Sequence, residues 1–416
     1  MRILWVKMGG LWPLTSGGRQ RSFHTLAQLA RRHDVTVVTT HAPGEDGGRL
    51  AAELPARATV ISVPFAPPKQ GTLRFAASLA ASWCTADPVD LHKWTSAGVR
   101  RAASTLLAER TFDLVVADFL SAVPNVPRST RCPTVLFEHN VEYLIWKRLC
   151  DLETRWWRRL PLAIEWRKLR RREIQACRAA SMTIAVSDDD ARRLADLAPG
   201  ARVLSVPTGV DVDYFTPGGG PQVPNRLVFS GSMDWYPNED AMLHFVEAIL
   251  PLVRREVPDA SLTIVGRRPS AKVQALARQA GVQVTGTVDD VRTYVGEAPV
   301  YVVPLRAGGG TRLKIFEALA MGKPVVSTTV GAEGLALQSG RDVVIADTPE
   351  AFSAAVVRLL REPAEREAIG AAGRALVEAR YSWASVTRAF ERGLQDAVAG
   401  AGAVRDVREA RAFTEA

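Results

Sequence analysis

The 416-residue sequence has few cysteines, and they form no cluster of metal ligands. Cys84, Cys132, Cys150 and Cys177 lie far apart and make no pair with the spacing of a zinc site or a redox motif. They are expected to be buried thiols in a reducing compartment. This pattern argues against a fold held together by disulfides.

Long apolar runs are also missing. The run near the start, residues 3–6, is soon followed by glycines, so it is too short for a signal-peptide core or a membrane span. No stretch elsewhere contains about 18 consecutive apolar residues. We therefore expect a cytoplasmic protein whose contact with the inner face of a membrane, if any, is peripheral.

Acidic residues are outnumbered by basic ones, 44 to 53, which gives a net charge of +9. This charge favours an anionic partner, such as a nucleotide sugar, a lipid headgroup or nucleic acid. Nucleic acid is the weakest of these, since the sequence has no zinc-finger spacing, RNA-recognition signature or basic heptad region. No GxGxxG pattern follows the first apolar run, which argues against a nicotinamide dehydrogenase.

Short apolar runs alternate with helical segments in both halves of the chain. The first half has runs at 3–6, 35–39, 59–63, 114–117, 134–138 and 182–186, and the second at 226–230, 262–265, 282–285, 300–303, 325–327 and 343–345. A strand, a helix and another strand form the unit of a parallel sheet covered by helices. The sequence therefore predicts an α/β protein with two Rossmann-like domains facing a central cleft, where ligands bind beyond the carboxyl ends of the strands.

The domain boundaries follow from composition. We expect a first domain at 1–207, an interdomain linker rich in proline and glycine at 208–225 and a second domain at 226–381. A closing helix at 382–400 and a flexible tail at 401–416 complete the expected organisation.

The segment 304–328, PLRAGGGTRLKIFEALAMGKPVVST, combines a glycine loop with a helix that begins close to two cations. Three glycines let a ligand approach the backbone, and the first turn of the helix favours negative charge. Arg312 and Lys314 add positive charge there, while Glu317 lies on nearly the same helix face and can accept hydrogen bonds from hydroxyls. A diphosphate that carries sugars fits these features.

This segment resembles the nucleotide-sugar site of the retaining glycosyltransferases of family 4, which have the GT-B fold. The linker element Thr208-Gly209-Val210-Asp211 and the run 229–233, Phe-Ser-Gly-Ser-Met, are similar to further landmarks of that family. The Gly-Thr-Arg-Leu-Lys motif resembles a branch often tied to bacterial exopolysaccharide assembly. One departure is that Gly309 stands where the family usually has the first of two glutamates, so only Glu317 remains.

The resemblance implies a metal-independent enzyme without a cofactor that moves a sugar, with retention, from a nucleoside diphosphate to a saccharide or lipid-linked acceptor. The first domain would bind the acceptor, the second the nucleotide sugar, and the closing helix would cross back to the first. The catalytic candidates are His139, Arg312 and Lys314. The donor-binding candidates are Gly17, Gly18, Gly231, Gly266, Arg267, Gly310, Thr311, Leu313 and Glu317.

His139 follows an apolar strand, and so it is expected at the carboxyl edge of the first sheet, in the polar company of Glu138, Asn140 and Glu142. In the family that the chain resembles, a histidine after this strand lies near the transferred sugar. A core histidine is the alternative interpretation, and nothing in the sequence identifies His139 as a base.

Two acidic runs look like metal ligands but have simpler explanations. The Asp211-Val212-Asp213 run lies in the linker, and the run Asp188-Asp189-Asp190 opens a helix, where carboxylates favour the helix N-terminus. We expect no metal site.

Residues 146–178 interleave arginines with four tryptophans, Trp146, Trp156, Trp157 and Trp166. Such a basic helix with aromatic anchors can lie on an anionic membrane surface; a solvated helix with tryptophans packed on the domain is the alternative. Two other functions also remain open. They are a sugar-nucleotide 2-epimerase of the same fold and a non-catalytic partner subunit.

Overall fold

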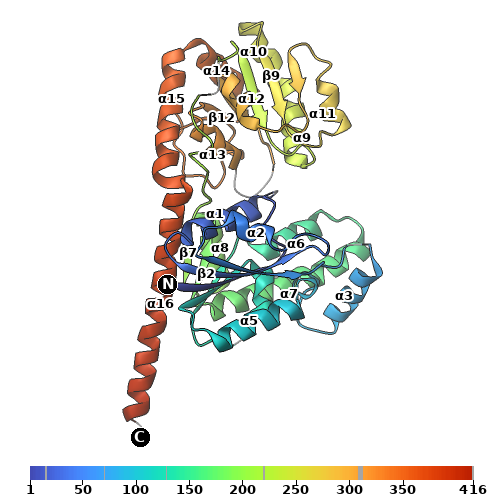
Figure 1. Cartoon of the computed structure of the whole chain (residues 1–416). Helices are drawn as coiled ribbons and strands as arrows, with labels where there is room; N and C mark the ends of the chain where they lie inside the picture. Colours follow the sequence, from blue (N-terminus) through green and yellow to red (C-terminus); the bar gives the residue numbers. More distant parts are fainter. Residues whose placement is uncertain (15, 70, 128, 219–220, 308–312, 415–416) are drawn as a thin grey trace. The chain divides into compact units, whose positions relative to one another are not determined.

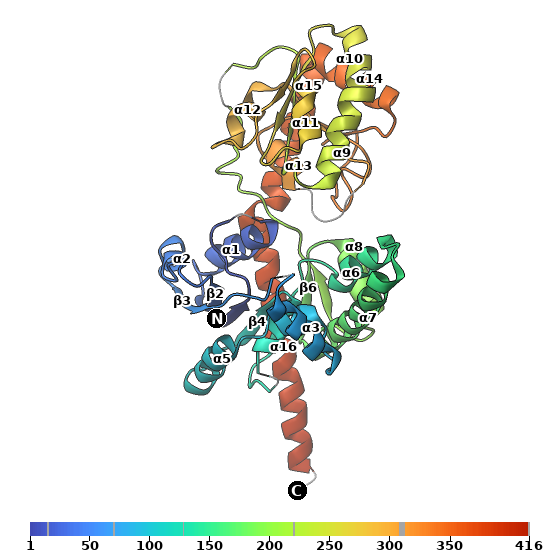
Figure 2. The ribbon, with the colours of Figure 1, turned by 90° about the vertical axis from the view of Figure 1, so that its right-hand side faces the viewer.

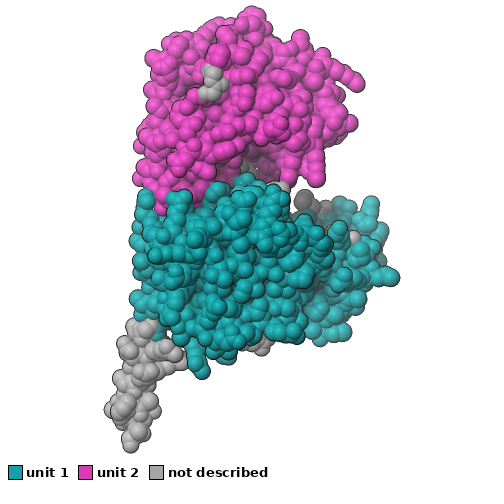
Figure 3. Space-filling model, viewed as in Figure 1, with its two compact units in different colours: residues 1–207, 386–416 teal, residues 208–385 magenta. Residues whose placement is uncertain are grey.

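A computed structural model describes residues 1–414 except 15, 70, 128, 219–220 and 308–312, with no side-chain description for 152 and 402–414. The chain divides into two compact units (Figures 1 and 3). Unit 1 comprises Met1–Pro207 and Val386–Ala416, and unit 2 comprises Thr208–Ser385.

Unit 1 contains a parallel sheet of seven strands. They are β1 (Arg2–Lys7), β2 (Asp34–His41), β3 (Ala58–Pro64), β4 (Leu114–Asp118), β5 (Thr134–Phe137), β6 (Met182–Ala185) and β7 (Val203–Ser205). The order across the sheet is β3-β2-β1-β4-β5-β6-β7. Strand β7, of three half-buried residues, is absent from the sequence-based prediction because so short a run carries little periodic signal.

Helices flank this sheet. They are α1 (Gly17–Leu29), α2 (Arg49–Glu53), α3 (Leu73–Trp83), α4 (Val89–Lys93), α5 (Ala97–Glu109), α6 (Glu142–Leu152), α7 (Trp156–Ala179) and α8 (Asp188–Leu197), with a 3-10 turn, η1 (Leu120–Asn125), after β4. The hydroxyls of Ser16, Ser96 and Ser187 accept hydrogen bonds from first-turn amides of α1, α5 and α8, which fixes where these helices begin. Helices α6 and α7 lie side by side in both views (Figures 1 and 2).

Unit 2 repeats the plan with six parallel strands. They are β8 (Arg226–Ser230), β9 (Ser261–Val265), β10 (Val282–Val284), β11 (Val300–Val303), β12 (Val325–Ser327) and β13 (Val344–Ile345), in the order β10-β9-β8-β11-β12-β13. Its helices are α9 (Tyr236–His244), α10 (Leu250–Glu256), α11 (Ala271–Leu276), α12 (Val291–Glu297), α13 (Leu313–Ala320), α14 (Pro349–Arg361) and α15 (Pro363–Leu376). Two parallel α/β sheets of this plan are the GT-B fold expected from the sequence.

A π-helical turn, η2 (Phe245–Ile249), separates α9 from α10 just before Pro251, which has no N–H to donate to the helix ladder. The last helix, α16 (Trp383–Thr414), extends well beyond residue 400. Within unit 1, Phe390 of α16 packs on Trp5 and Phe137, with ring centroids 5.8 and 4.8 Å apart.

The linker glycine of the Thr208-Gly209-Val210-Asp211 element has a packing role. A Cβ at Gly209 would lie 2.5 Å from the indole of Trp383, so no other residue fits beneath that ring. Val210 also forms a β-bridge with Ser382. The start of the linker is therefore fixed against the start of α16 within unit 2.

Candidate functional site

Each sheet has a point where the strand order reverses, and such points place ligand sites at the carboxyl edge of open α/β sheets. In unit 1 this point lies between β1 and β4, where Lys7 and Asp118 are register partners at the ends of their strands. In unit 2 it lies between β8 and β11. The predicted site residues that the structure describes gather at these two edges.

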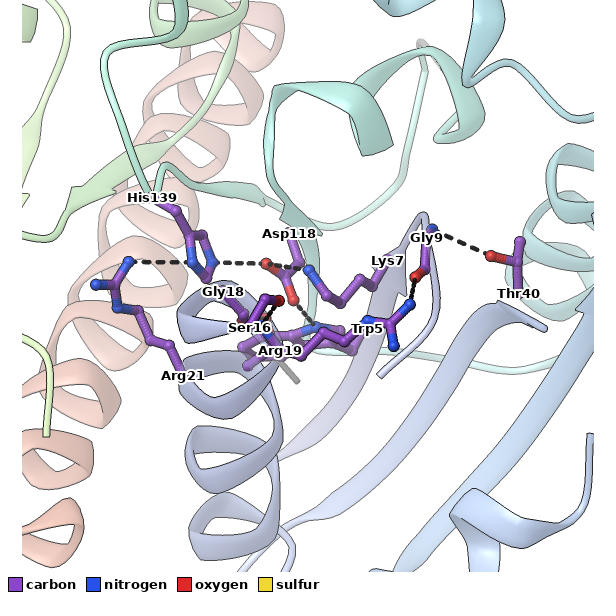
Figure 4. Close-up of polar contacts among 11 residues, drawn as sticks. Trp5, Lys7, Gly9, Ser16, Gly18, Arg19, Arg21, Thr40, Asp118 and His139 are labelled. Atoms are coloured by element: carbon purple, nitrogen blue, oxygen red, sulfur yellow. Dashed lines mark hydrogen bonds and ion pairs between the residues drawn. The ribbon is translucent and has the colours of Figure 1, made fainter. Parts of the chain in front are cut away.

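The edge of unit 1 holds a buried polar network around His139 (Figure 4). The His139 Nε2 atom lies 2.8 Å from Asp118 Oδ1, and Nδ1 lies 3.1 Å from Arg21 Nη1. Asp118 also accepts a 2.9 Å hydrogen bond from the Trp5 indole N–H and pairs with Lys7 Nζ at 3.6 Å. Five side chains from β1, α1, β4 and the end of β5 are thus joined.

The partners of His139 define its protonation state. A guanidinium can only donate hydrogen bonds, so Nδ1 accepts from Arg21, and the proton on Nε2 points to Asp118. Burial lowers the pKa of His139 to about 3, which keeps the ring neutral. Burial raises the pKa of Asp118, but the charge of Lys7 and the hydrogen bonds from His139 and Ser22 outweigh it and lower the value to about 2. Because both ring nitrogens are engaged, His139 is placed to position its neighbours.

Phe119 connects this network to the start of α1. Its backbone has a φ of 72°, unusual for a bulky residue, and its ring stacks on His139 with centroids 3.7 Å apart. Lys7 Nζ lies 4.0 Å from the same ring centroid. A Cβ at Gly18 would lie 2.7 Å from the Phe119 ring, so Gly18 lets the first turn of α1 approach it.

Gly17 and Gly18, two of the donor-binding candidates, form the first turn of α1. Ser16, the N-cap, Gly18 and Arg19 line a cavity of about 270 Å³ in unit 1. A helix N-terminus with a glycine turn suits a negatively charged or oxygen-rich group. The predicted contact of these two glycines with the donor stays a prediction.

Three further carboxyl groups lie near His139. Glu138 is 1% exposed, and burial together with the charges of Glu173 and Glu142 raises its pKa well above the usual range. Glu173 accepts hydrogen bonds from the backbone N–H groups of Glu142 and Tyr143 at 2.7 and 3.2 Å, which anchors the start of α6 on α7. Glu138 and Glu173 therefore belong to a buried acidic cluster.

In unit 2, two glycines allow the loops after β8 and β9 to come together. A Cβ at Gly266 would lie 1.7 Å from the carbonyl oxygen of Gly231. A Cβ at Gly231 would lie 2.6 Å from Lys314 Nζ and 2.8 Å from the Asn238 amide nitrogen. Glycine at both positions therefore lets the two loops and the Lys314 side chain pack closely together.

Lys314 is held at the start of α13 by two neighbours. Its Nζ donates a 2.7 Å hydrogen bond to Asn238 Oδ1 and lies 4.0 Å from the centroid of the Phe229 ring. Glu317 lies one turn further along the helix. Burial raises the pKa of Glu317 to about 7, and the charge of Lys314 opposes that rise.

Arginines surround the loop after β8, which itself contains no cation. Arg267 donates from Nε to Ser232 Oγ at 2.8 Å, and Arg268 pairs with Asp234 at 3.4 Å. Arg306, which the sequence analysis did not select, is held by both carboxylate oxygens of Asp240. The structure thus brings Gly231, Gly266 and Lys314 together, with Arg267 on the adjoining loop.

Other predicted residues lie at or beyond the limit of the description. Gly310, Thr311 and Arg312 lie outside the described residues, as does Gly309, and Leu313 is the first described residue of α13. Their roles stay predictions.

Three residues of the His139 network, Lys7, Asp118 and Arg21, were not predicted from the sequence. A signal was available for the first two, because each is a charged residue that ends an apolar strand. Their pairing depends on the register of β1 and β4, which the sequence does not reveal.

The acidic runs have structural roles. The Asp211 carboxylate accepts hydrogen bonds from the backbone N–H groups of Asp213 and Tyr214, which closes a turn. Asp188 opens α8 behind its N-cap Ser187. Across the described part of the chain, no three His, Cys, Asp or Glu side chains are grouped to hold a metal ion. In the same residues no helix combines the length and apolarity needed to span a bilayer.

Comparisons with known proteins agree with this geometry. A model described as Glycosyltransferase Family 4 matches residues 16–214, and one described as Glycosyl transferases group 1 matches 224–362. Sucrose-phosphate synthase from Thermosynechococcus elongatus has a similar fold, with a TM-score of 0.68 at 15% identity over 94% of this chain and 97% of that one. Anabaena HepE in complex with UDP gives 0.63 at 14% identity over 95% and 100%.

Sequence relatives include the phosphatidyl-myo-inositol mannosyltransferase of Mycobacterium tuberculosis, 32% identical over 234 residues, or 53% of this chain and 60% of the relative. A GDP-mannose-dependent monoacylated alpha-(1-6)-phosphatidylinositol monomannoside mannosyltransferase of Corynebacterium glutamicum is 28% identical over 205 residues, or 43% and 52%. The chain therefore matches less than two thirds of the length of these relatives. The two family models together span most of the chain, and with these relatives they support a glycosyltransferase of family 4.

Proposed function

We propose that the protein is a retaining, metal-independent glycosyltransferase that moves a sugar from a nucleoside diphosphate to a lipid-linked saccharide in polysaccharide or glycoconjugate biosynthesis. The observation that carries the proposal is the position of Lys314, whose ammonium group is held by Asn238 next to Gly231 at the carboxyl edge of the unit 2 sheet. The names of the mannosyltransferase relatives, which include a GDP-mannose-dependent enzyme, and the UDP complex of HepE support a nucleotide-sugar donor.

In this proposal unit 2 binds the donor. Lys314 and Arg267 bind the diphosphate. Its binding site is completed by Arg312 and by the backbone amides of Gly310 and Thr311. As the bond between sugar and phosphate breaks, negative charge grows on the leaving diphosphate, and donors already in place stabilise it. The carboxylate of Glu317 accepts hydrogen bonds from the ribose hydroxyls. Gly231 and Gly266 let the loops after β8 and β9 pack closely, with the ammonium of Lys314 beside them.

Unit 1 binds the acceptor in this scheme. The α1 N-terminus offers amide groups to an oxygen atom of the ligand, and the network of His139, Asp118 and Lys7 holds β1, β4 and β5 in place beneath it. His139 has no nitrogen lone pair left for a proton, so we assign it to positioning, without a role as base.

A comparison of Lys314→Ala with Lys272→Ala tests the donor site. Lys272 lies exposed on α11 and serves as the matched control. First, a thermal-shift screen with nucleoside diphosphates identifies the base, and hydrolysis of the matching nucleotide sugars then measures turnover. We expect Lys314→Ala to lower turnover roughly 10²- to 10³-fold without unfolding the protein, as for the loss of one preorganised donor. Wild-type rates in that variant would refute the assignment.

The same assays separate two other functions. A sugar-nucleotide 2-epimerase would release an altered sugar nucleotide in the absence of acceptor. A non-catalytic partner subunit, for which Gly309 in place of the usual glutamate is an argument, would bind a nucleoside diphosphate and never turn over its sugar. Product analysis with and without saccharide acceptors distinguishes these outcomes from transfer.

We further propose that helices α3, α6 and α7 present a surface that binds an anionic membrane, where a lipid-linked acceptor would lie. Large apolar side chains are exposed on these helices, namely Ile145, Leu149, Trp156, Trp157, Leu160 and Ile164 on α6 and α7 and Leu73 and Trp83 on α3. Trp156 is 74% exposed and Trp157 57%. Arg155, Arg158 and Arg159 are exposed among them, and basic residues beside aromatic anchors favour anionic lipid surfaces.

Helix α3 belongs to this surface because Lys168 of α7 donates a 2.7 Å hydrogen bond to the carbonyl oxygen of Ser82. Trp146, in contrast, packs against the cluster formed by Leu91, Leu120 and Leu169, and so it serves the core of unit 1.

Sedimentation with vesicles tests this surface. We expect binding to vesicles that contain phosphatidylglycerol, little binding to phosphatidylcholine alone, and strongly reduced binding for Trp156→Ala/Trp157→Ala. Tyr236→Ala, which removes an exposed aromatic of unit 2, is the control. Equal sedimentation of the double variant and the wild type would contradict the assignment.

A further inference from the structure

The residues that line the cavity beside α1 indicate the chemical class of the acceptor, which the proposed function leaves open. Its volume of about 270 Å³ equals that of roughly nine water molecules, which suits one sugar ring. Besides the start of α1, the walls include Lys7, Asp90 of α4, Trp94 and Glu142 at the start of α6. All these residues belong to unit 1.

The two cations in the cavity wall are already engaged by the protein. Lys7 pairs with Asp118 and lies against the Phe119 ring. Arg19 donates from its guanidinium to the carbonyl oxygens of Gly9 at 2.9 Å and Pro13 at 3.2 Å, which holds the loop after β1. A phosphate in the cavity would have to compete with these contacts.

The two carboxyl groups in the cavity wall can form hydrogen bonds with the hydroxyl groups of a ligand. Asp90 pairs with Lys93 one turn along α4, outside the cavity lining. Burial and the nearby charge of Asp90 raise the pKa of Glu142 to about 7, with hydrogen bonding from Asn140 and the charges of Lys93 and Lys7 opposing the rise. A carboxyl near its pKa can accept a hydrogen bond from a hydroxyl or donate one to it. A phosphate beside Asp90 and Glu142 would instead meet like charge.

Trp94 supplies an apolar wall. Its indole packs against Phe65 with centroids 6.1 Å apart. A Cβ at Gly9, whose φ is +85°, would lie 3.3 Å from the Trp94 ring, so the loop after β1 touches the indole edge. A flat aromatic wall beside hydrogen-bonding carboxyls suits a sugar, which has apolar C–H faces and a polar rim.

We infer that this cavity binds the accepting ring of the substrate as an uncharged, hydroxyl-rich sugar, oriented by Glu142 and Asp90, and that it disfavours a ring that itself carries a phosphate. The inference rests on the proposed function, because it assigns an acceptor class to a glycosyltransferase. On a lipid-linked acceptor, the phosphate would then be separated from the accepting ring by at least one further group.

Equilibrium binding to the full chain tests the inference without relying on transfer. Ligand-observed NMR titrations compare the methyl α-glycosides of glucose, mannose and galactose with the corresponding sugar 1-phosphates. We expect at least one methyl glycoside to bind the wild type more tightly than its 1-phosphate does. Glu142→Ala should weaken that glycoside about tenfold, as for the loss of a hydrogen bond to a charged group.

A conservative variant separates charge from shape. Glu142→Gln keeps the size of the side chain, so we expect it to fold and to lose most of the discrimination against the 1-phosphate. Glu109→Gln removes an exposed carboxylate at the end of α5, outside the cavity lining, and should keep wild-type affinities.

Three results would overturn the inference: tighter or equal binding of the 1-phosphates by the wild type, no binding of any methyl glycoside, or unchanged discrimination in Glu142→Gln. Donor hydrolysis, measured on the same preparations, keeps this failure distinct from failure of the proposed function. If the donor is hydrolysed but the methyl glycosides do not bind as expected, only the inferred acceptor class is wrong. If nucleoside diphosphates do not stabilise the protein and nucleotide sugars are not hydrolysed, the proposed function fails as well.

Discussion

His139 and Asp118 form a fully buried pair at the carboxyl edge of the unit 1 sheet. Their side chains are 1% and 0% exposed, and His139 Nε2 lies 2.8 Å from Asp118 Oδ1. Asp118 also pairs with Lys7, so one carboxylate satisfies groups from β1 and from the end of β5. Rigid groups beneath a ligand site are useful because they hold the residues above them in place.

Replacing Asp118 with Asn is expected to destabilise unit 1 strongly, because it leaves the buried ammonium of Lys7 without a counter-charge. The free energy of unfolding should fall by about 3–5 kcal/mol, as is usual when one partner of a buried ion pair is removed. Asp113→Asn is the matched control, since Asp113 pairs with Arg2 at the surface at 3.8 Å; its cost should stay below about 1 kcal/mol. Equal effects in denaturant titrations of the two variants would contradict this account.

His139 should make the protein less stable in mild acid. Its folded pKa of about 3, set by burial, is below its ordinary value of 6.5. Between these values the unfolded chain binds the extra proton, so this contribution is fully present above about pH 6.5 and is lost as the pH falls toward 3. Wild type should lose up to about 1.4 kcal/mol per pH unit relative to His139→Gln in that window.

The substituted glutamine keeps a donor for Asp118 and an acceptor for Arg21, so the protein should still fold. His33→Gln, which removes a histidine that contacts Glu391, is the control. Denaturant unfolding at a series of pH values measures the difference. A constant gap between wild type and His139→Gln across the acid range would show that the buried ring does not titrate as described.

The positions of most strands could be predicted from the sequence because parallel strands covered on both faces appear as short apolar runs. Side-chain contacts between neighbouring strands were harder to predict from the sequence. Lys7 and Asp118 become neighbours only through the register of β1 and β4, and no local pattern reveals that register. The sequence shows Glu138 as a polar neighbour of His139, but it does not reveal that this carboxyl group is buried.

Helical regions show the same limit. Residues 146–178 were considered as one basic helical stretch, whereas the structure separates α6 from α7. Trp146 is partly buried, while Trp156 and Trp157 remain exposed. The helical spacing of apolar residues predicted the helices, but the covered face depends on where the chain turns. The outward-facing apolar residues of α3 were missed for that reason.

Alanine at the two glycines of unit 2 should have different consequences. At Gly266 the new Cβ would meet the backbone carbonyl of Gly231, which cannot move freely, so we expect a loss of at least about 2 kcal/mol in unfolding free energy. At Gly231 the Cβ would meet the flexible end of Lys314, so stability should fall less and donor turnover more. Denaturant unfolding and donor hydrolysis measure the two effects. Normal turnover in a folded Gly231→Ala variant would contradict the assigned role of Lys314.

Titration of Glu317 should make the stability of the protein depend on pH, and with it the binding of the nucleotide. Burial raises its folded pKa to about 7 from an ordinary value of 4.5. Between these values the folded chain holds more protons than the unfolded chain, so stability falls as the pH rises through this window. Glu317→Gln cannot titrate, and its free energy of unfolding relative to wild type should increase by on the order of 2 kcal/mol from about pH 5 to about pH 8.

Donor affinity should show the opposite trend, because the ribose hydroxyls bind best to the ionised carboxylate. Wild-type affinity for the preferred nucleoside diphosphate should rise as the pH increases through about 7, whereas Glu317→Gln should bind more weakly and with a flatter profile. Glu333→Gln, a change at an exposed carboxylate of unit 2, is the control and should follow the wild type. Calorimetric titrations across the pH range decide the point, since an unchanged pH profile in Glu317→Gln would exclude this carboxyl from the nucleoside site.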